Sequence, residues 1–311
     1  MWPPTGDLGE RLEGEMGTLS GFAAVLMWSL LALLTARSGA VPPFQMNALT
    51  FGIGTLVGLV IFVARGASPK VFRQLPAVWA LGIGGLFGYH ALYFAALRNA
   101  PPAEASLIAY LWPLLIVLGS AFLPGERLRW FHAAGAVLGL VGAGLIVTRG
   151  GSVAFSPQYA LGYGLAALCA LFWSAYSLLS RRFGTVPTDV VTGFCAATAA
   201  LSLVCHLLFE TTVWPQGPGQ WTCVVLLGLF PVGLAFYVWD YGVKHGDIQV
   251  IGAASYAAPL LSTLVLILAG EAVLTGAIVA AALFVTAGAA LSALPLFARL
   301  VRQPGRRSVR P

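Results

Sequence analysis

Charged residues are scarce in this chain. Asp, Glu, Lys and Arg make up only 9% of its 311 residues, against roughly 25% in an ordinary soluble domain. Hydrophobic residues make up 59%, and the mean hydropathy is +0.86. A water-soluble protein of this size needs a charged surface that so few charges cannot form. The composition therefore excludes a soluble globule and predicts an integral membrane protein.

Motifs of catalysis and of metal binding are also missing. The sequence contains no H-E-x-x-H, no G-x-S-x-G, no Walker-type phosphate loop and no His/Cys/Asp cluster with metal-ligand spacing. We therefore expect no enzyme activity, no metal, no other cofactor and no ATP site in the chain itself, and no ATPase partner is evident. The few cysteines lie in apolar stretches without disulfide spacing, which predicts small core residues: Cys169, Cys195, Cys205 and Cys223.

The start of the chain lacks the basic character of a secretory signal peptide. A signal peptide begins with positive charges before its apolar core. Here Arg11 is the single base among several acids, and Met16 is an alternative start. The acids of this segment are Asp7, Glu10, Glu13 and Glu15.

Long apolar runs dominate the rest of the sequence. A helix that crosses a bilayer needs about 20 mainly apolar residues. This criterion predicts an all-α membrane protein with ten spans and almost no extramembrane domain. The predicted spans are 18–36, 44–64, 77–97, 101–123, 130–148, 159–180, 189–209, 220–242, 247–269 and 273–298.

The basic residues are distributed unevenly between the two sides of this topology. The side of the N-terminus holds 14 of the 17, including Arg65, Arg127, Arg181 and the tail 299–311. Basic loops stay in the cytoplasm, so both termini are predicted to be cytoplasmic. The Arg- and Ala-rich composition is typical of a GC-rich bacterial genome, which indicates the inner membrane. The basic tail favours contact with lipid headgroups rather than with nucleic acid.

The sequence repeats itself at an offset of 145–146 residues. Trp28-Ser29 returns as Trp173-Ser174, and Gly125-Glu126 returns as Gly270-Glu271. Further matches at this offset are Arg37 with Arg182, Gly39 with Gly184, Pro42 with Pro187, Arg98 with Lys244, Tyr110 with Tyr256 and Pro113 with Pro259. Each repeat holds five spans, an odd number, so the second repeat is inverted relative to the first. Inverted repeats that enclose a site near the membrane midplane are typical of secondary transporters.

The repeat divides the chain into predicted parts. These are an N-terminal cytoplasmic segment 1–17, a first five-helix repeat 18–148, a linker 149–158, a second repeat 159–298 and the tail 299–311. With its proline-bearing fourth spans and Gly-Glu turns, the sequence from 18 to 298 resembles the EamA family of the drug/metabolite transporter superfamily. The resemblance implies a ten-helix basket whose central cavity is bounded mainly by spans 1, 3, 4, 6, 8 and 9. Within the family, the aromatic-rich spans are most similar to those of aromatic amino-acid exporters.

His90 is an ionisable residue well inside the third span. Ionisable groups at this depth are costly and usually functional. Tyr89 and Tyr93 lie on the same helix face as His90 because they are spaced by one to four residues. A histidine here can sense pH, relay a proton or hydrogen-bond a substrate carboxylate, and packing against a neighbouring helix is the structural alternative.

Other charges avoid the span centres. Asp240 lies near the cytoplasmic end of span 8, where we expect a rim or gate role, and pairing with Lys244 at i+4 is the simpler interpretation. No Asp or Glu lies at the centre of a span, where an ion-coupled pump normally keeps one. No Lys or Arg lies there either, as recognition of a phosphate would favour. The cargo is therefore predicted to be neutral or zwitterionic.

Aromatic residues are abundant where the charges are missing. Trp and Tyr normally lie at the membrane interfaces, and those deep in a span need polar partners. We expect such residues to bind substrate, together with Ser255 beside the second proline. The predicted set is Trp28, Tyr89, His90, Tyr93, Tyr110, Trp112, Trp173, Tyr176, Tyr237, Ser255 and Tyr256. Core packing is the alternative for each.

Two prolines and several glycines are predicted to shape the helices. Pro113 and Pro259 lie at matched depths in spans 4 and 9, where each removes a helical hydrogen bond, so they are candidate hinges. The glycines recur as small-xxx-small pairs that mark close helix packing. These pairs are Gly54/Gly58, Gly84/Gly88 and Gly135/Gly139.

Together, these features predict a secondary transporter that exports aromatic and other neutral amino acids across the bacterial inner membrane. Alternating access, either uncoupled or proton-linked, is the expected mechanism. Its partners would be the small-molecule substrate and the lipid bilayer. An exporter of another neutral metabolite or drug is the alternative on the same fold. A lipid-modifying membrane enzyme is the alternative of another class, although it would need clustered acids that this sequence lacks.

Overall fold

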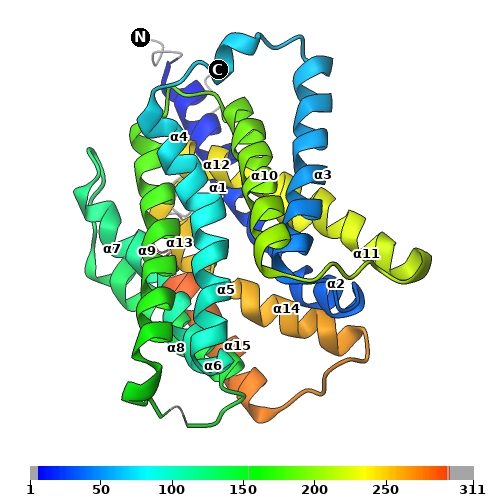
Figure 1. Cartoon of the computed structure of the whole chain (residues 1–311). Helices are drawn as coiled ribbons and strands as arrows, with labels where there is room; N and C mark the ends of the chain where they lie inside the picture. Colours follow the sequence, from blue (N-terminus) through cyan, green and yellow to red (C-terminus); the bar gives the residue numbers. More distant parts are fainter. Residues whose placement is uncertain (1–5, 153, 293, 295–311) are drawn as a thin grey trace.

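The computed structural model describes residues 6–152, 154–292 and 294, and the regular structure of this part is entirely helical (Figure 1). Nine segments in it are long and apolar enough to cross a membrane, and a further apolar helix, Gly276–Ser292, has 17 residues. The predicted all-α architecture is confirmed. Apart from residue 294, the predicted end of the last span and the basic tail lie outside the described residues.

The first repeat contains five spans, three of which are interrupted. The helix of span 1 begins at Gly6, twelve residues before the predicted span. The segments are α1 (Gly6–Trp28) and α2 (Leu31–Arg37); α3 (Pro43–Ala64); α4 (Pro76–Ile83), the π-helical turn η2 (Gly84–Gly88) and α5 (Tyr89–Asn99); α6 (Pro102–Ala109), α7 (Trp112–Gly119) and η3 (Ser120–Phe122); and α8 (Trp130–Val147). The short 3-10 turn η1 (Pro69–Phe72) connects α3 to α4.

The second repeat follows the same plan in the opposite direction. Its segments are η4 (Pro157–Tyr159) and α9 (Ala160–Arg182); η5 (Thr188–Val190) and α10 (Val191–Phe209); α11 (Gly217–Leu229), the π-helical turn η6 (Phe230–Leu234) and α12 (Ala235–His245); α13 (Ile248–Ala254) and α14 (Ala257–Leu268); and α15 (Gly276–Ser292). Here the N-terminal side means the face on which α1 begins, and the far side means the opposite face.

Spans 4 and 9 are interrupted at equivalent places. α6 ends at Ala109 and α7 begins at Trp112, so the break directly precedes Pro113. The matching break between α13 and α14 precedes Pro259 by a few residues. Because proline has no N–H, the carbonyl four residues earlier loses its helical partner, and the helix yields at this point. Span 1 is also interrupted, between α1 and α2, which the sequence did not indicate.

The two π-helical turns are related by the repeat. η2 begins at Gly84 and η6 begins at Phe230, which corresponds to the repeat offset of 146. A π turn disrupts the i to i−4 pattern and leaves main-chain groups available to side chains. Both turns do so here: His90 bonds to the carbonyl of Leu86, and Trp28 donates its indole N–H to the carbonyl of Pro231 at 3.1 Å.

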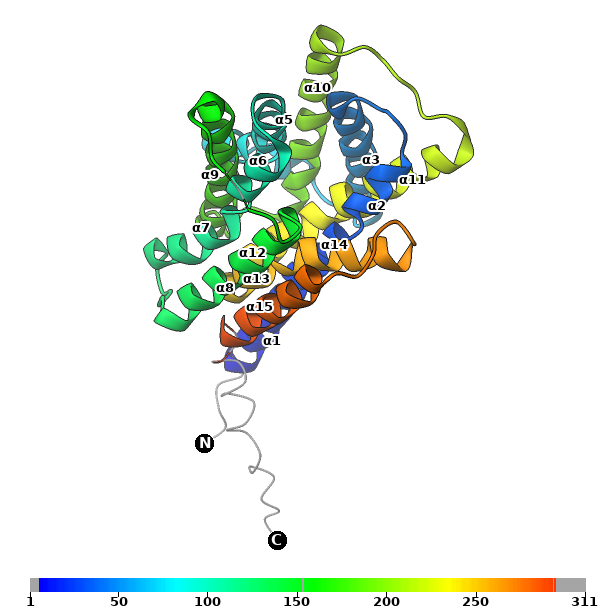
Figure 2. The same cartoon turned by 90° about the horizontal axis from the view of Figure 1, so that it is seen from below.

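The halves pack against one another through equivalent pairs of helices. α1 packs on α12 and α9 packs on α5, while α3 pairs with α10 and α8 pairs with α15. The α8–α15 pair is visible as neighbouring, strongly inclined helices in the view from below (Figure 2). Each pair joins one helix of the first repeat to one of the second, so the molecule is held together by contacts between the halves.

Glycines allow the predicted close approaches. A Cβ on Gly135 would lie 2.5 Å from the carbonyl oxygen of Gly288 on α15, and one on Gly54 would lie 3.0 Å from the Cα of Gly233 in η6. A Cβ on Gly139 would meet the ring of Tyr256 at 2.4 Å. The interpretation of these glycines as packing residues is confirmed at these three positions.

Candidate substrate cavity

A cavity of about 550 Å³ lies between the two halves. Spans 1 to 4 of the first repeat and α9, α11, η6, α12 and α14 of the second contribute to its wall. It extends to the loop between α2 and α3 on the far side, at Ser38, Gly39 and Val41. Its volume lies within the range of about 300–1,000 Å³ that is usual for sites of small organic ligands.

The wall of the cavity is mainly apolar and aromatic, and among the described residues that form it none is acidic or strongly basic. His90 contributes an imidazole to this wall. The remaining lining residues are Trp28, Leu31, Ala32, Thr35, Ser38, Gly39, Val41, Pro43, Met46, Asn47, Thr50, Tyr89, Tyr93, Phe94, Ala109, Tyr110, Trp112, Trp173, Leu227, Pro231, Val232, Phe236, Ala258 and Ser262. Such a wall does not offer full opposite charges to an ionic ligand.

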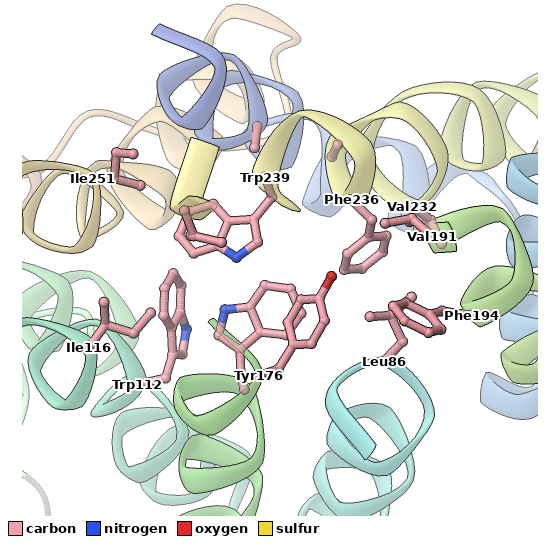
Figure 3. Packing of buried hydrophobic residues seen from close by; sticks show 14 of the residues in the cluster. Leu86, Trp112, Ile116, Tyr176, Val191, Phe194, Val232, Phe236, Trp239 and Ile251 are labelled. Atoms are coloured by element: carbon pink, nitrogen blue, oxygen red, sulfur yellow. The ribbon is translucent and has the colours of Figure 1, made fainter. Parts of the chain in front are cut away.

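Four tryptophans close the end of the cavity that lies nearest to the N-terminal side. Ring centroids of Trp28 and Trp239 are 5.0 Å apart, those of Trp112 and Trp239 are 5.7 Å apart, and Trp173 stacks on Trp239 at 5.8 Å. Figure 3 shows Trp112 and Trp239 next to one another in an edge-to-face arrangement, with Tyr176 and Phe236 nearby. Trp239 is fully buried and donates its indole N–H to the Ser177 hydroxyl at 3.1 Å. This cluster blocks passage in the present conformation.

Asp240 forms a buried polar layer between the tryptophans and the N-terminal side. Its carboxylate binds the Lys244 ammonium at 2.7 Å, which confirms the predicted i+4 pair. It also accepts hydrogen bonds from Thr188 at 2.8 Å and from Tyr176 at 3.3 Å. The Asp240 and Lys244 side chains are only 1% and 3% exposed. Removing one partner would leave a buried charge uncompensated, so this layer holds α9, η5 and α12 together strongly.

A second ion pair lies at the N-terminal surface. The Arg181 guanidinium binds Glu126 at 2.6 Å and also donates to the carbonyls of Val243 and Gly246 at the end of α12. Burial raises the pKa of Glu126, the Arg181 charge acts in the opposite direction, and the Asp247 charge raises it further. Arg181 thus connects α9, the loop before α8 and α12 across the closed side.

Contacts on the far side are more exposed. Arg37 binds Glu271 at 2.8 Å, with both side chains about half exposed. Arg98, also half exposed, approaches Glu210 at 3.5 Å. Glu210 itself is buried, accepts from His206 and caps the start of α3 through the N–H groups of Phe44 and Gln45. The helix ends on this side are therefore held in place without closing the cavity.

Most of the aromatic residues that the sequence predicts as substrate ligands line this cavity. They are Trp28, Tyr89, His90, Tyr93, Tyr110, Trp112 and Trp173.

The other predicted ligands lie elsewhere in this conformation. Tyr176 bonds to Asp240, and Tyr237 donates to the carbonyl of Gly54 and to Thr192. Tyr256 accepts from the Leu114 N–H, and Ser255 donates to the Ile251 carbonyl.

Several cavity residues were missed by the sequence reasoning. Asn47 and Thr50 on α3 place buried polar groups at the wall, and Phe236 contributes a ring next to Trp173. The Asn47 amide donates weakly to Ser202 at 3.4 Å. A polar residue within a predicted span is itself a signal of a functional site, and this signal was present at Asn47 and Thr50 although neither side chain is charged or aromatic. Within the described ranges, no three His, Cys, Asp or Glu side chains come together as a metal site would require.

This arrangement defines a class of protein. Two inverted five-span repeats enclose a central cavity that is open on one side and closed on the other, which is the architecture of a secondary transporter. The chain belongs to the EamA-like transporter family, whose profile matches residues 15–148 and 160–294.

Three relatives show how closely the chain is related to known proteins. It is 58% identical over 278 residues to a protein of Ancylobacter novellus named aromatic amino acid exporter YddG, covering 89% of this chain and 96% of the relative. The Escherichia coli K12 protein of the same name is 26% identical, over 80% of this chain and 87% of that one. A solved crystal structure, 56% identical, covers 91% of this chain and 98% of its own with a TM-score of 0.87.

Proposed function

We propose that this transporter exports aromatic and other neutral amino acids by alternating access. The observation that carries the proposal is the cavity wall, which is rich in indole, phenol and phenyl rings and has no acidic or strongly basic side chain. Aromatic rings pair with one another with a gain of roughly 0.5–1.5 kcal/mol beyond the burial of their area. The Ancylobacter novellus relative is named an aromatic amino acid exporter, which supports the same cargo.

The closed side gives alternating access a physical basis. Three successive layers separate the cavity from the N-terminal face: the four tryptophans, the Asp240 group and the Arg181–Glu126 pair. Passage requires all three to separate while the far side closes. Asp240 is proposed as a gate residue, and Pro113 and Pro259 as hinges, because the helices on either side of the breaks can turn as short rigid pieces.

The direction follows from the distribution of charge. Basic residues at the N-terminal side include Arg65, Arg127 and Arg181, and basic loops remain in the cytoplasm. We therefore assign the N-terminal side to the cytoplasm of a bacterial cell, with the protein in the inner membrane and both termini cytoplasmic. The cavity then faces outwards in this conformation, which is the state that releases an exported substrate.

Flux of a labelled amino-acid panel into proteoliposomes of the purified chain tests the cargo, with and without a pH gradient. We expect uptake of phenylalanine, tyrosine and tryptophan, and weaker uptake of large neutral amino acids. A response to the gradient would support proton coupling through His90, and equal rates would support uncoupled transport. Flux of no amino acid, by protein that is folded and inserted, would overturn the proposed cargo and favour another neutral metabolite or drug.

Three alanine substitutions test the site. Tyr89→Ala, His90→Ala and Trp112→Ala each remove a cavity group and should lower aromatic amino-acid flux at least about tenfold, since each removes packing or a hydrogen bond to the cargo. Trp130→Ala is the matched control, because Trp130 is 74% exposed and remote from the cavity. Normal flux in all three cavity variants would refute the assignment of the site.

A further inference from the structure

An amino-acid cargo carries an ammonium and a carboxylate, yet the cavity wall offers neither a carboxylate nor a strongly basic side chain. Both charged ends must therefore be recognised by neutral groups, and hydrogen bonds in which one partner is charged are strong enough to do so. The inference below rests on the proposed function.

His90 has a defined polarity. Its Nδ1 lies 2.7 Å from the main-chain carbonyl of Leu86, and a carbonyl oxygen can only accept, so Nδ1 carries the hydrogen. In the neutral ring, Nε2 then carries a lone pair and acts as an acceptor. The π-helical turn η2 contains the carbonyl that fixes this tautomer. No carboxylate in the cavity wall is present to neutralise an imidazolium at this position.

Aromatic rings surround the imidazole. The imidazole of His90 lies 5.2 Å from the ring of Phe51, 5.2 Å from that of Tyr89, 6.1 Å from that of Phe94 and 6.3 Å from that of Phe236, measured between centroids. Ring faces attract cations through their quadrupoles. An acceptor nitrogen among aromatic rings therefore suits an ammonium group, rather than the carboxylate that sequence reasoning allowed for His90.

Two indole donors lie near this acceptor, on the other side of Tyr89 and Phe236. Of the four clustered tryptophans, Trp28 and Trp239 already donate to Pro231 and Ser177. Trp112 and Trp173 line the cavity, and in the described part of the chain neither indole N–H has an acceptor. An indole N–H is a donor only. These two groups therefore suit a carboxylate.

The acceptor and the donors are close enough to bind the ammonium and the carboxylate that one α-carbon carries. Tyr89 contacts both His90 and Trp173, at 5.2 and 5.6 Å between ring centroids. Phe236 likewise contacts both, at 6.3 and 5.7 Å. His90 and Trp173 thus face a common space, separated by about one side chain.

We propose that the Nε2 lone pair of His90 binds the α-ammonium group of the cargo, and that the indole N–H groups of Trp112 and Trp173 bind its α-carboxylate. His90 then selects for a free amino group, and the two tryptophans select for a free carboxylate. The remaining apolar wall receives the side chain. Recognition of this kind needs no charged residue in the membrane, which agrees with the composition of the cavity.

Equilibrium binding of three ligands to purified full-length protein tests the assignment. Phenylalanine has both groups, phenethylamine lacks the carboxylate, and 3-phenylpropionate lacks the ammonium. His90→Phe keeps an aromatic ring but loses the acceptor. It should weaken binding of phenylalanine and phenethylamine about tenfold or more and leave 3-phenylpropionate unchanged. His90→Gln keeps an acceptor oxygen and should restore amine binding in part.

Trp112→Phe combined with Trp173→Phe should give the reverse pattern. Binding of phenylalanine and 3-phenylpropionate should fall, and phenethylamine should bind as before. Melting temperature and a single elution peak establish that each variant is folded. The assignment would be overturned if His90→Phe weakened the binding of all three ligands equally, or if the double tryptophan variant bound phenethylamine more weakly. Either result would leave the proposed cargo intact. Failure of the unaltered protein to bind any of the three would overturn both.

Discussion

The guanidinium of Arg181 lies 2.6 Å from the carboxylate of Glu126 on the closed side of the cavity. Glu271 is related to Glu126 by the repeat offset of 145 residues, and it binds Arg37 at 2.8 Å on the open side. The Arg181 and Glu126 side chains are 24% and 18% exposed, whereas those of Arg37 and Glu271 are 50% and 47% exposed. The two glutamates are repeat partners, whereas the arginines are offset by one position because Arg37 corresponds to Arg182. Related ion pairs thus lie in unequal environments, as expected if the two sides exchange states during transport.

Loss of Arg181 should open the N-terminal side. Arg181→Ala removes an ion pair and two hydrogen bonds to carbonyls of α12. Charge-assisted hydrogen bonds contribute about 1.5–3 kcal/mol each, so the open population should rise about tenfold or more. The measurement is the rate at which a water-soluble maleimide labels Val78→Cys, a position that is 4% exposed, in a background without the native cysteines.

Arg37→Ala is the matched control for this experiment. It removes the half-exposed pair with Glu271, the repeat partner of Glu126, and such pairs contribute about 0–1 kcal/mol. Labelling of Val78→Cys should then change by no more than about fivefold. Equal effects of the two substitutions would contradict a closed side held by Arg181.

Acidification should weaken the Arg181–Glu126 ion pair. Burial raises the pKa of Glu126 despite the neighbouring Arg181, and the Asp247 charge adds to the rise. Glu126 therefore takes up a proton at a higher pH than an exposed glutamate, and the ion pair is lost as the pH falls through this raised pKa. The folded state binds this proton more tightly than the unfolded chain does. The contribution of Glu126 to the free energy of unfolding thus grows as the pH falls, even though the contacts that close the N-terminal side become weaker.

The ratio of the labelling rate of Val78→Cys to that of the exposed reference Trp130→Cys, measured between pH 8 and pH 4, checks this effect, because the ratio cancels the loss of reactive thiolate at low pH. It should increase with a midpoint above about 4.3, the ordinary value for glutamate. Glu126→Gln should label rapidly throughout and lose this transition. If Glu126→Gln kept the transition with the same midpoint, the pH dependence of labelling would belong to another titratable group.

Close packing of α8 on α15 should be sensitive to a single methyl group. A Cβ on Gly288 would lie 2.5 Å from the carbonyl oxygen of Gly135, whereas one on Gly276, in the same helix, would meet nothing within 4 Å. Overpacking of this kind costs about 1–3 kcal/mol. Gly288→Ala should lower the melting temperature of the purified protein by several degrees, and Gly276→Ala should not. Equal melting temperatures would mean that the helices separate at no cost.

The helical fold and its division into repeats could be predicted because both depend on patterns within the sequence. Apolar runs of span length define the helices, and a constant offset defines the repeat. The interruption of span 4 was also predictable, since Pro113 removes a hydrogen bond wherever the helix lies. The position of the first interruption, between α1 and α2, could not be predicted, because no proline or glycine marks it.

Which face of a helix is turned inwards was harder to predict. Tyr237 was expected in the cavity, but the structure places Phe236 there and points Tyr237 at Gly54 and Thr192. The π-helical turn η6 immediately precedes both residues and changes the register of α12, and no periodicity in the sequence reports such a turn. Asn47 was missed for a different reason, since it is polar but carries no charge.

Filling the cavity tests the transport pathway most directly. Ala32 lines the cavity, and Ala36 lies one turn later on the same short helix but is not part of the wall. Counterflow of labelled phenylalanine in proteoliposomes should be abolished by Ala32→Trp, because the indole occupies space that the cargo needs. Ala36→Trp should transport at close to the normal rate. Normal counterflow by folded Ala32→Trp would contradict passage of the cargo through this cavity.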